Sequence, residues 1–117
     1  MDDYEEEFLV GVLVDEGHFG NDGLQPQVTV RMHVRHEELF RWLVLKVPGS
    51  KLYGPYHHGG RNYFQWMVRG KALRDEVVPI LRRRLPSLDS HVRSRIEQMF
   101  ATYKLEEDGA PEDGPPR

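Results

Sequence analysis

Residues 8–14 form an apolar run that ends abruptly in Asp15, Glu16 and Gly17. Because this run is apolar on every side, we predict that it is buried all round. Buried segments rarely finish in paired carboxylates, since a charge taken out of water is costly unless a cation or a hydrogen-bond donor meets it. Asp15 and Glu16 are therefore expected to have a partner.

Either a buried strand or a buried helix can carry this run, and its three valines favour a strand. Its flanks favour a helix: five acids crowd residues 1–7, where a helix dipole favours negative charge, and Gly17 occupies the position of a C-cap glycine. We predict a helix from Asp3 to about Asp15. Gly11 inside it costs about 1 kcal/mol relative to alanine. We expect Gly11 to let another backbone come close, most naturally that of a second copy of the helix.

Alternation with a period of two indicates strands further along the chain. Residues 18–22 predict a short first strand and residues 27–33 a second, while residues 51–57 and 62–69 predict a hairpin joined by residues 58–61. One face of these strands is apolar and is expected to pack against helices. The other displays Gln27, Thr29, Arg31, His33, Lys51, Tyr53, Arg61, Tyr63 and Gln65. Plain solvent exposure explains such a face, and so does contact with phosphates and base edges.

Apolar residues at helical spacing predict three further helices. They span residues 37–46, residues 71–84, and a last segment from a cap at Asp89 or Ser90 to about Tyr103. Pro79 is expected to kink or break the second of them, and its basic end, residues 82–84, is explained by the helix C-terminal dipole. Residues 106–117 hold Pro, Gly and acids with almost nothing to bury and are predicted to be a disordered tail.

Residues 9–17, LVGVLVDEG, resemble the motif that names the LAGLIDADG homing endonucleases. The matches at its first, third, eighth and ninth positions are Leu9, Gly11, Glu16 and Gly17. The chain departs from the motif at Val14, where Asp is usual, and at Asp15, where Ala or Gly is usual. The order of elements downstream is similar to the α-β-β-α-β-β-α plan of that family as far as Leu105. Further similar stretches are residues 27–33 running into 36–40, residues 49–54 and residues 63–68.

The resemblance implies an α+β domain over residues 1–105, in which a four-stranded antiparallel saddle sheet is backed by helices. In that family the acid in the eighth position, here Glu16, holds a divalent cation at the DNA cleft, and two motif helices pack side by side. A chain with one motif would act as a homodimer, whose two Glu16 carboxylates and neighbouring carbonyls make an oxygen-rich site suited to Mg²⁺. The implied reaction is hydrolysis of both strands of double-stranded DNA, with the saddle in the major groove.

The resemblance and the polar alternation together assign roles to individual residues. The catalytic residues are Glu16, His33 and His91, the metal ligands are Glu16 and Asp15, and the dimer interface is formed by Leu9, Gly11, Val12 and Val14. The DNA-binding residues are Gln27, Thr29, Arg31, Arg35, Lys51, Tyr53, Arg61, Tyr63, Gln65 and Arg93. His91 stands near the position where family enzymes use a basic residue to support the charge of the transition state.

Net charge at first argues against a nucleic-acid partner, because 16 Lys and Arg face 19 Asp and Glu, a formal charge of −3. The distribution reverses this impression, since residues 1–7 and 105–117 hold ten of the acids and one base, Arg117. Between Phe8 and Lys104, 15 bases face 9 acids, a balance of +6. A basic core is consistent with a polyanionic ligand. An ordinary solvated surface explains the charge alone equally well.

Composition also bounds the class of protein. With no cysteine the chain has neither a disulfide framework nor a thiolate metal site, and it holds no apolar stretch of roughly 18 residues. We expect a soluble, cytoplasmic protein without a membrane partner. The six histidines lack zinc-finger spacing, and the neighbours His57 and His58 are expected to point to opposite sides and not to chelate one ion. Phosphate-binding loops and nucleophile elbows are not found in the sequence.

Three functions remain open. We favour a homodimeric, Mg²⁺-dependent endonuclease of the homing type. The alternative is a non-catalytic DNA-binding protein that retains the fold, which the departures at Val14, Asp15 and His91 support. The third is a small interaction module whose basic face binds a protein or another acidic ligand.

Overall fold

The computed structural model describes residues 1–21, 25–103 and 105. The first half of the chain forms helix α1 (Asp3–Glu16), strands β1 (Gly17–Asn21) and β2 (Pro26–His33), the 3-10 turn η1 (Val34–His36) and helix α2 (Glu37–Lys46). A hairpin of strands β3 (Lys51–His58) and β4 (Arg61–Arg69) follows. The chain then forms helix α3 (Gly70–Ala72), the π turn η2 (Leu73–Val77), helix α4 (Val78–Arg84), the 3-10 turn η3 (Leu85–Ser87) and helix α5 (Ser90–Tyr103). This order confirms the predicted α-β-β-α-β-β-α plan. The disordered tail predicted at residues 106–117 lies outside the described residues.

Helix α1 begins with a capping box. The Asp2 carboxylate accepts a hydrogen bond from the Glu5 backbone N–H at 2.8 Å, and the Glu5 carboxylate accepts one from the Asp2 N–H at 3.2 Å. The helix ends at Gly17, whose extended backbone enters β1 with no intervening loop. A Cβ on Gly17 would collide with the carbonyl oxygen of Leu13, so only glycine fits this junction.

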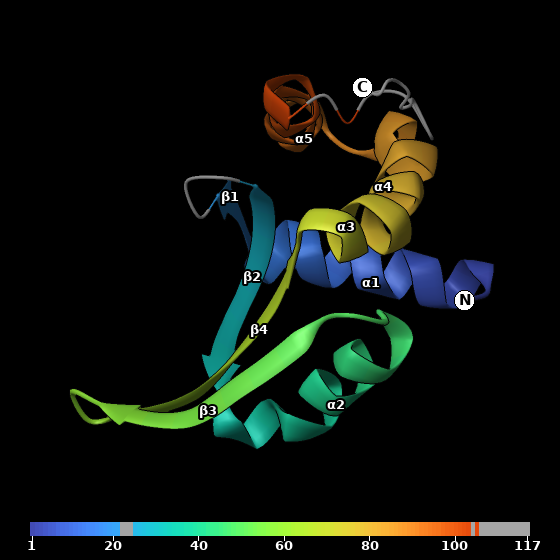
Figure 1. Ribbon diagram of the computed structural model, residues 1–117. Helices are drawn as coiled ribbons and strands as arrows, with labels where there is room; N and C mark the ends of the chain where they lie inside the picture. The colour runs from blue at the N-terminus through green and yellow to red at the C-terminus, as the bar shows by residue number, and fades with distance from the viewer. Residues whose placement is uncertain (22–24, 104, 106–117) are drawn as a thin grey trace.

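The four strands form one antiparallel sheet in the order β1-β2-β4-β3, which confirms the predicted sheet. Its apolar face carries cross-strand pairs such as Val28 with Val68 and Val30 with Trp66, and all four side chains are buried. The β3–β4 hairpin turns at Gly59 and Gly60, both with positive φ, as a tight two-residue hairpin turn requires. Figure 1 shows the helices gathered on one side of the sheet, so that the other face stays open.

Strand β3 contains a bulge that the sequence prediction missed. Tyr53 pairs with Gln65, but Tyr56 pairs with Tyr63, so one extra residue lies in β3 at Gly54 and Pro55. Proline is tolerated here because β3 is an edge strand. Beyond the bulge the even-numbered residues of β3, and no longer the odd-numbered ones, share the polar face.

The helix predicted at residues 71–84 is interrupted. Residues 73–77 form a π turn in which the N–H of Val78 bonds to the carbonyl of Leu73, directly before Pro79. Proline has no N–H to donate and its ring crowds the preceding turn, which accounts for the local widening. The expected break at Pro79 is therefore a π turn followed by α4.

The acidic start of α1 is held by arginines of α4. Arg83 Nη2 lies 2.5 Å from Glu6 Oε2, and Arg84 Nη2 lies 3.2 Å from Glu6 Oε1 and 3.2 Å from Asp3 Oδ1. The hydrogen bond from Arg83, supported by Arg84, lowers the pKa of the Glu6 carboxyl, which is 8% exposed. These ion pairs, and not only the helix dipole that we invoked from the sequence, explain the basic end of α4.

The prediction that the apolar run is buried all round is wrong for the single chain. Leu9, Val10 and Leu13 are buried against the sheet and α4, whereas Phe8 is 47% exposed and Val12 is half-buried. One face of α1 thus belongs to the core and the other faces outward.

Candidate nucleic-acid interface and active site

The open face of the sheet carries eight of the side chains predicted to bind DNA. Cross-strand partners point to the same side of a sheet, and the register pairs Arg31 with Gln65, Tyr53 with Gln65, and Thr29 and Lys51 with Met67. The eight residues on this polar face are Gln27, Thr29, Arg31, Lys51, Tyr53, Arg61, Tyr63 and Gln65. The sheet therefore brings together residues from three strands onto one surface.

The same register places His33, which pairs with Tyr63, on this face. It also adds five residues to which the sequence analysis gave no site role, namely His18, Tyr56, His58, Met67 and Arg69. Met67 and Arg69 continue the alternation of β4 and were available from the sequence. Tyr56 and His58 were hidden by the bulge, for which the Gly54–Pro55 pair was the only signal.

The paired positions of this polar face carry no acidic residue among the described residues. Its cationic side chains are Arg31, Lys51, Arg61 and Arg69. Acids instead lie on the helices, where several are paired, as Glu6 is with Arg83 and Glu5 is with Lys46 at 2.7 Å. The positive charge counted in the sequence is thus in part neutralised on the helical side, whereas the described paired positions of the polar face hold no acid.

Arg31 has a defined position at the centre of this face. Its Nε donates a hydrogen bond to Gln65 Oε1 at 2.7 Å, and its Cζ lies 6.0 Å from the centroid of the Tyr63 ring. Tyr63 in turn packs against Tyr56 with ring centroids 5.4 Å apart. A cleft of about 370 Å³ opens beside this group and is lined by Arg31, His33, Arg61 and Tyr63 together with Met32, Gly60 and Asn62.

Asp15 and Glu16 end α1 with exposed side chains. Within the described part of the chain, neither carboxylate forms a hydrogen bond or an ion pair. The sequence argument gave them a partner because it assumed burial, and exposure removes that need. Gly17 pairs with Val30, so the end of α1 lies beside the middle of β2, next to Arg31 in sequence.

The carboxylates of Asp15 and Glu16 fit a hard cation. Mg²⁺ is commonly bound through one or two carboxylates and keeps several waters, and these two acids offer open oxygen donors. Among the described residues no three His, Asp or Glu side chains lie together around one point. A second copy of the α1 end would add two further carboxylates.

The remaining predicted site residues lie apart from one another. His33 is exposed at the end of β2, and its Nδ1 accepts a hydrogen bond from the N–H of Arg35 at 2.9 Å. His91 is exposed on the first turn of α5, while Arg93 Nη1 donates to the Leu88 carbonyl at 3.4 Å and so points toward the α4–α5 connection. In the described residues neither histidine forms a hydrogen bond with Glu16.

The outward face of α1 includes Tyr4, Glu7, Phe8, Gly11, Val12 and Asp15, at helical spacing. A Cβ on Gly11 would meet no atom of its own chain within 4 Å. Grooves of about 460 and 260 Å³ border this face, and Gly11 contributes to both. Gly11 is exposed and Val12 and Val14 are half-buried, so their place at a dimer interface stays a prediction. Leu9 is not open to a partner, because it is 0% exposed inside the core of its own chain.

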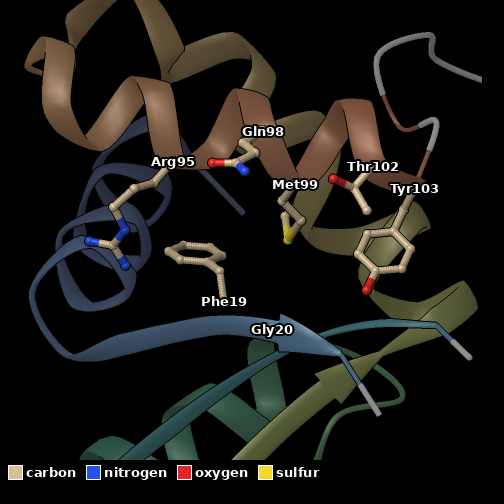
Figure 2. Close-up of a pocket in the computed structure, with 7 residues that line it drawn as sticks. All are labelled: Phe19, Gly20, Arg95, Gln98, Met99, Thr102 and Tyr103. Atoms are coloured by element: carbon tan, nitrogen blue, oxygen red, sulfur yellow. The ribbon is translucent and has the colours of Figure 1, made fainter. Parts of the chain in front are cut away.

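Another cavity, of about 330 Å³, lies between β1 and α5. Figure 2 shows Phe19 and Met99 lining it with Arg95, whose guanidinium sits 5.6 Å from the Phe19 ring centroid. Phe19 is on the helix side of the sheet because it pairs with Val28. This cavity is therefore separate from the polar face, and it contains none of the predicted site residues.

Comparison with known proteins gives no matching family model and no matching curated protein. Among solved structures, the chain is similar to the group I intron-encoded homing endonuclease I-CeuI complexed with DNA, with a TM-score of 0.71 and 15% identity over 96% of this chain. It is also similar to the archaeal intron-encoded homing endonuclease I-Vdi141I complexed with DNA, with a TM-score of 0.69 and 9% identity over 89% of this chain. A mutant of I-SmaMI matches with a TM-score of 0.55 and 11% identity over 93% of this chain.

The chain is shorter than these proteins, spanning 59%, 69% and 45% of the I-CeuI, I-Vdi141I and I-SmaMI chains, respectively. Identities this low show a shared fold.

Proposed function

We propose that this chain, which has the fold of the LAGLIDADG homing endonucleases, binds double-stranded DNA on its sheet and cuts both strands as a homodimer with Mg²⁺. The single observation that supports DNA binding best is the polar face of the sheet. Eight side chains chosen from sequence alone share one face, cations lie along it, and its described positions include no acid. A cationic β-surface of this kind suits the major groove, where β-ribbons read base edges.

Helix α1 supports the homodimer. Its outward face carries Tyr4 at 81% exposure and Phe8 at 47%, and Gly11 leaves room for a second backbone. The two grooves beside Gly11 can receive side chains of a partner helix, as ridges of one helix pack into grooves of another. Packing two α1 helices in parallel, about a two-fold axis that runs along them, would bring both Glu16 carboxylates to the same end of the interface.

Glu16 is the residue to which we assign the metal, with Asp15 beside it. Their exposed carboxylates would bind the ion at the end of α1, beside the middle of β2. Held by these carboxylates, Mg²⁺ would supply a Lewis acid able to activate a water and to stabilise the departing oxygen of the phosphodiester. His33 accepts the Arg35 N–H at Nδ1, so its neutral ring carries the proton at Nε2 and can donate it to a phosphate oxygen. We assign His91 to support of the transition-state charge.

A non-catalytic DNA-binding protein is the alternative. The specific observation in its favour is the departure of Val14, Asp15 and His91 from the motif and its supporting positions. Binding through the polar face needs none of these three residues, so DNA affinity would persist where cleavage has been lost.

A cleavage assay on a library of randomised duplexes separates these functions. Wild type, Glu16→Gln and the control Glu38→Gln, an exposed acid on α2, are compared across a Mg²⁺ titration, with the mass of each protein measured in the same samples. We expect Mg²⁺-dependent cleavage of both strands by wild type and Glu38→Gln, none by Glu16→Gln, and a dimer mass for all three.

Salt-sensitive binding by all three proteins without any cutting would favour the non-catalytic alternative. A monomer that binds no duplex at low salt would contradict both, and would leave an interaction module as the remaining function.

A further inference from the structure

The group that holds Arg31 differs from the groups that hold three arginines in ion pairs with described acids. Arg41, Arg83 and Arg84 contact carboxylates, which neutralise them. Arg31 instead donates its Nε–H to the neutral amide oxygen of Gln65 at 2.7 Å. The side chain is thus fixed in place while it keeps its full positive charge.

The hydrogen bond to Gln65 occupies only one of the N–H donors of the Arg31 guanidinium. A guanidinium has five N–H groups, and the Nε–H is the one engaged. Two parallel donors of the Nη1 and Nη2 groups therefore remain for a ligand. Tyr63, with its ring 6.0 Å from Arg31 Cζ, backs the guanidinium on one side and is itself packed against Tyr56.

The position of Arg31 favours a base edge over a phosphate. β2 and β4, which carry Arg31 and Gln65, are the two central strands of the sheet. A duplex lying on the polar face would place the floor of its major groove against the central strands and its phosphate backbones against the edge strands. A contact to phosphate needs charge alone, whereas readout of a base needs a side chain whose direction is fixed beforehand.

We propose, on the basis of the proposed DNA-binding function, that Arg31 reads a guanine in the major groove, held for this purpose by Gln65 and Tyr63. Guanine presents O6 and N7 as two neighbouring acceptors, which match the two parallel donors of Arg31. Adenine presents N6 as a donor next to N7, so one donor of the fork would meet another donor. In a two-fold dimer the guanine would occur once in each half-site, on opposite strands.

Selection from randomised duplexes, followed by affinity measurements at two salt concentrations, tests this assignment. The proteins are wild type, Arg31→Lys, Arg31→Ala and the control Arg61→Ala, an exposed arginine on the same face. We expect wild type to prefer G·C at one position of each half-site by about 5- to 150-fold. Arg31→Ala should lose the preference at that position alone, whereas Arg31→Lys, which keeps the charge but not the planar fork, should reduce the preference and keep the salt dependence. Arg61→Ala should weaken binding to all sequences, because Arg61 is one of the proposed DNA-binding residues, but it should keep the preference for G·C.

A modified target sharpens the test. Replacing the selected guanine with 7-deazaguanine removes the N7 acceptor, so it should weaken wild type about tenfold and leave Arg31→Ala unaffected. Gln65→Ala should reduce the guanine preference without changing the salt dependence, because it frees the side chain and removes no charge.

Two outcomes would overturn the assignment while leaving the proposed function intact: an equal loss of affinity for all sequences in Arg31→Ala, or a lost preference for a base other than guanine. Failure of wild type to bind any duplex would overturn the proposed function and this assignment together.

Discussion

The Nη2 atom of Arg84 in α4 lies 3.2 Å from Oε1 of Glu6 in α1, which joins the ends of two helices 78 residues apart in sequence. Arg83 completes the contact at the other carboxylate oxygen. Because these hydrogen bonds favour the charged carboxylate, the pKa of Glu6 in the folded chain lies below its ordinary value. The contribution of Glu6 to stability is therefore present above the unfolded pKa of about 4.3 and is lost as the pH falls through the lower folded pKa.

Glu6→Gln should lower the free energy of unfolding at pH 7 by about 2 kcal/mol, the scale of hydrogen bonds to a charged group. The difference from wild type should shrink below pH about 4, because wild-type Glu6 then takes up a proton as well. Urea unfolding at pH 7, 5, 4 and 3 measures both effects. Glu97→Gln, an exposed acid on α5, is the control and should follow wild type throughout. If the difference in unfolding free energy between Glu6→Gln and wild type stays constant from pH 7 to pH 3, the ion-pair explanation is contradicted.

Gly17→Ala should destabilise the chain by about 1–3 kcal/mol. The new Cβ would collide with the Leu13 carbonyl at the junction of α1 and β1, so the end of the helix must shift. Gly20→Ala, three residues along the same strand, is the control, because its Cβ would make only ordinary contacts with His18. Thermal unfolding of both variants checks the prediction, which fails if they melt at the same temperature.

The fold could be predicted from the sequence because local signals and the motif agreed. Alternation marked β2 and β4, and the acids before Phe8 together with Gly17 bounded α1 to within one residue of its observed end. What escaped prediction depends on contacts distant in sequence. The bulge at Gly54 and Pro55 changes which residues of β3 face outward, and this appears only when β3 is paired with β4.

For the candidate site, the sequence predicted which strand residues share the polar face but not the contacts between them. Residues on the sheet follow from strand parity, so Arg31 and Gln65 were assigned to one surface, but their hydrogen bond depends on a cross-strand register that no local pattern contains. Leu9 was assigned to the dimer interface because a run that is apolar on all sides does not reveal which face its own core covers. Only the packing of α1 distinguishes Leu9, which is buried, from Phe8, which is exposed.

Lys51→Ala should weaken DNA binding equally for all sequences and reduce the slope of log affinity against log salt by about 1. Lys51 is exposed at the start of edge strand β3 on the polar face, where a phosphate contact is expected. Lys71→Ala is the charge-matched control, because Lys71 lies on α3 and pairs with Asp75 at 2.5 Å. Binding isotherms at several salt concentrations measure the slopes. An equal reduction in both variants would show that net charge, and not the sheet face, governs binding.

Gly11→Arg should change two properties in opposite directions. In its own chain Gly11 has open space at the Cβ position, and arginine is a better helix former than glycine, so the isolated chain should gain up to about 1 kcal/mol in stability. Between two α1 helices the same side chain would prevent close approach, so the mass should fall to that of a monomer and cleavage of both strands should be lost.

Ser94→Arg, at an exposed position of α5, is the control for the Gly11 substitution and should leave mass and cleavage unchanged. Mass measurements and unfolding curves on the same samples separate the two effects. A Gly11→Arg variant that stays dimeric would place the interface elsewhere. One that unfolds would mean that Gly11 serves the fold of its own chain, since loss of a partner alone leaves the core around Leu13 intact.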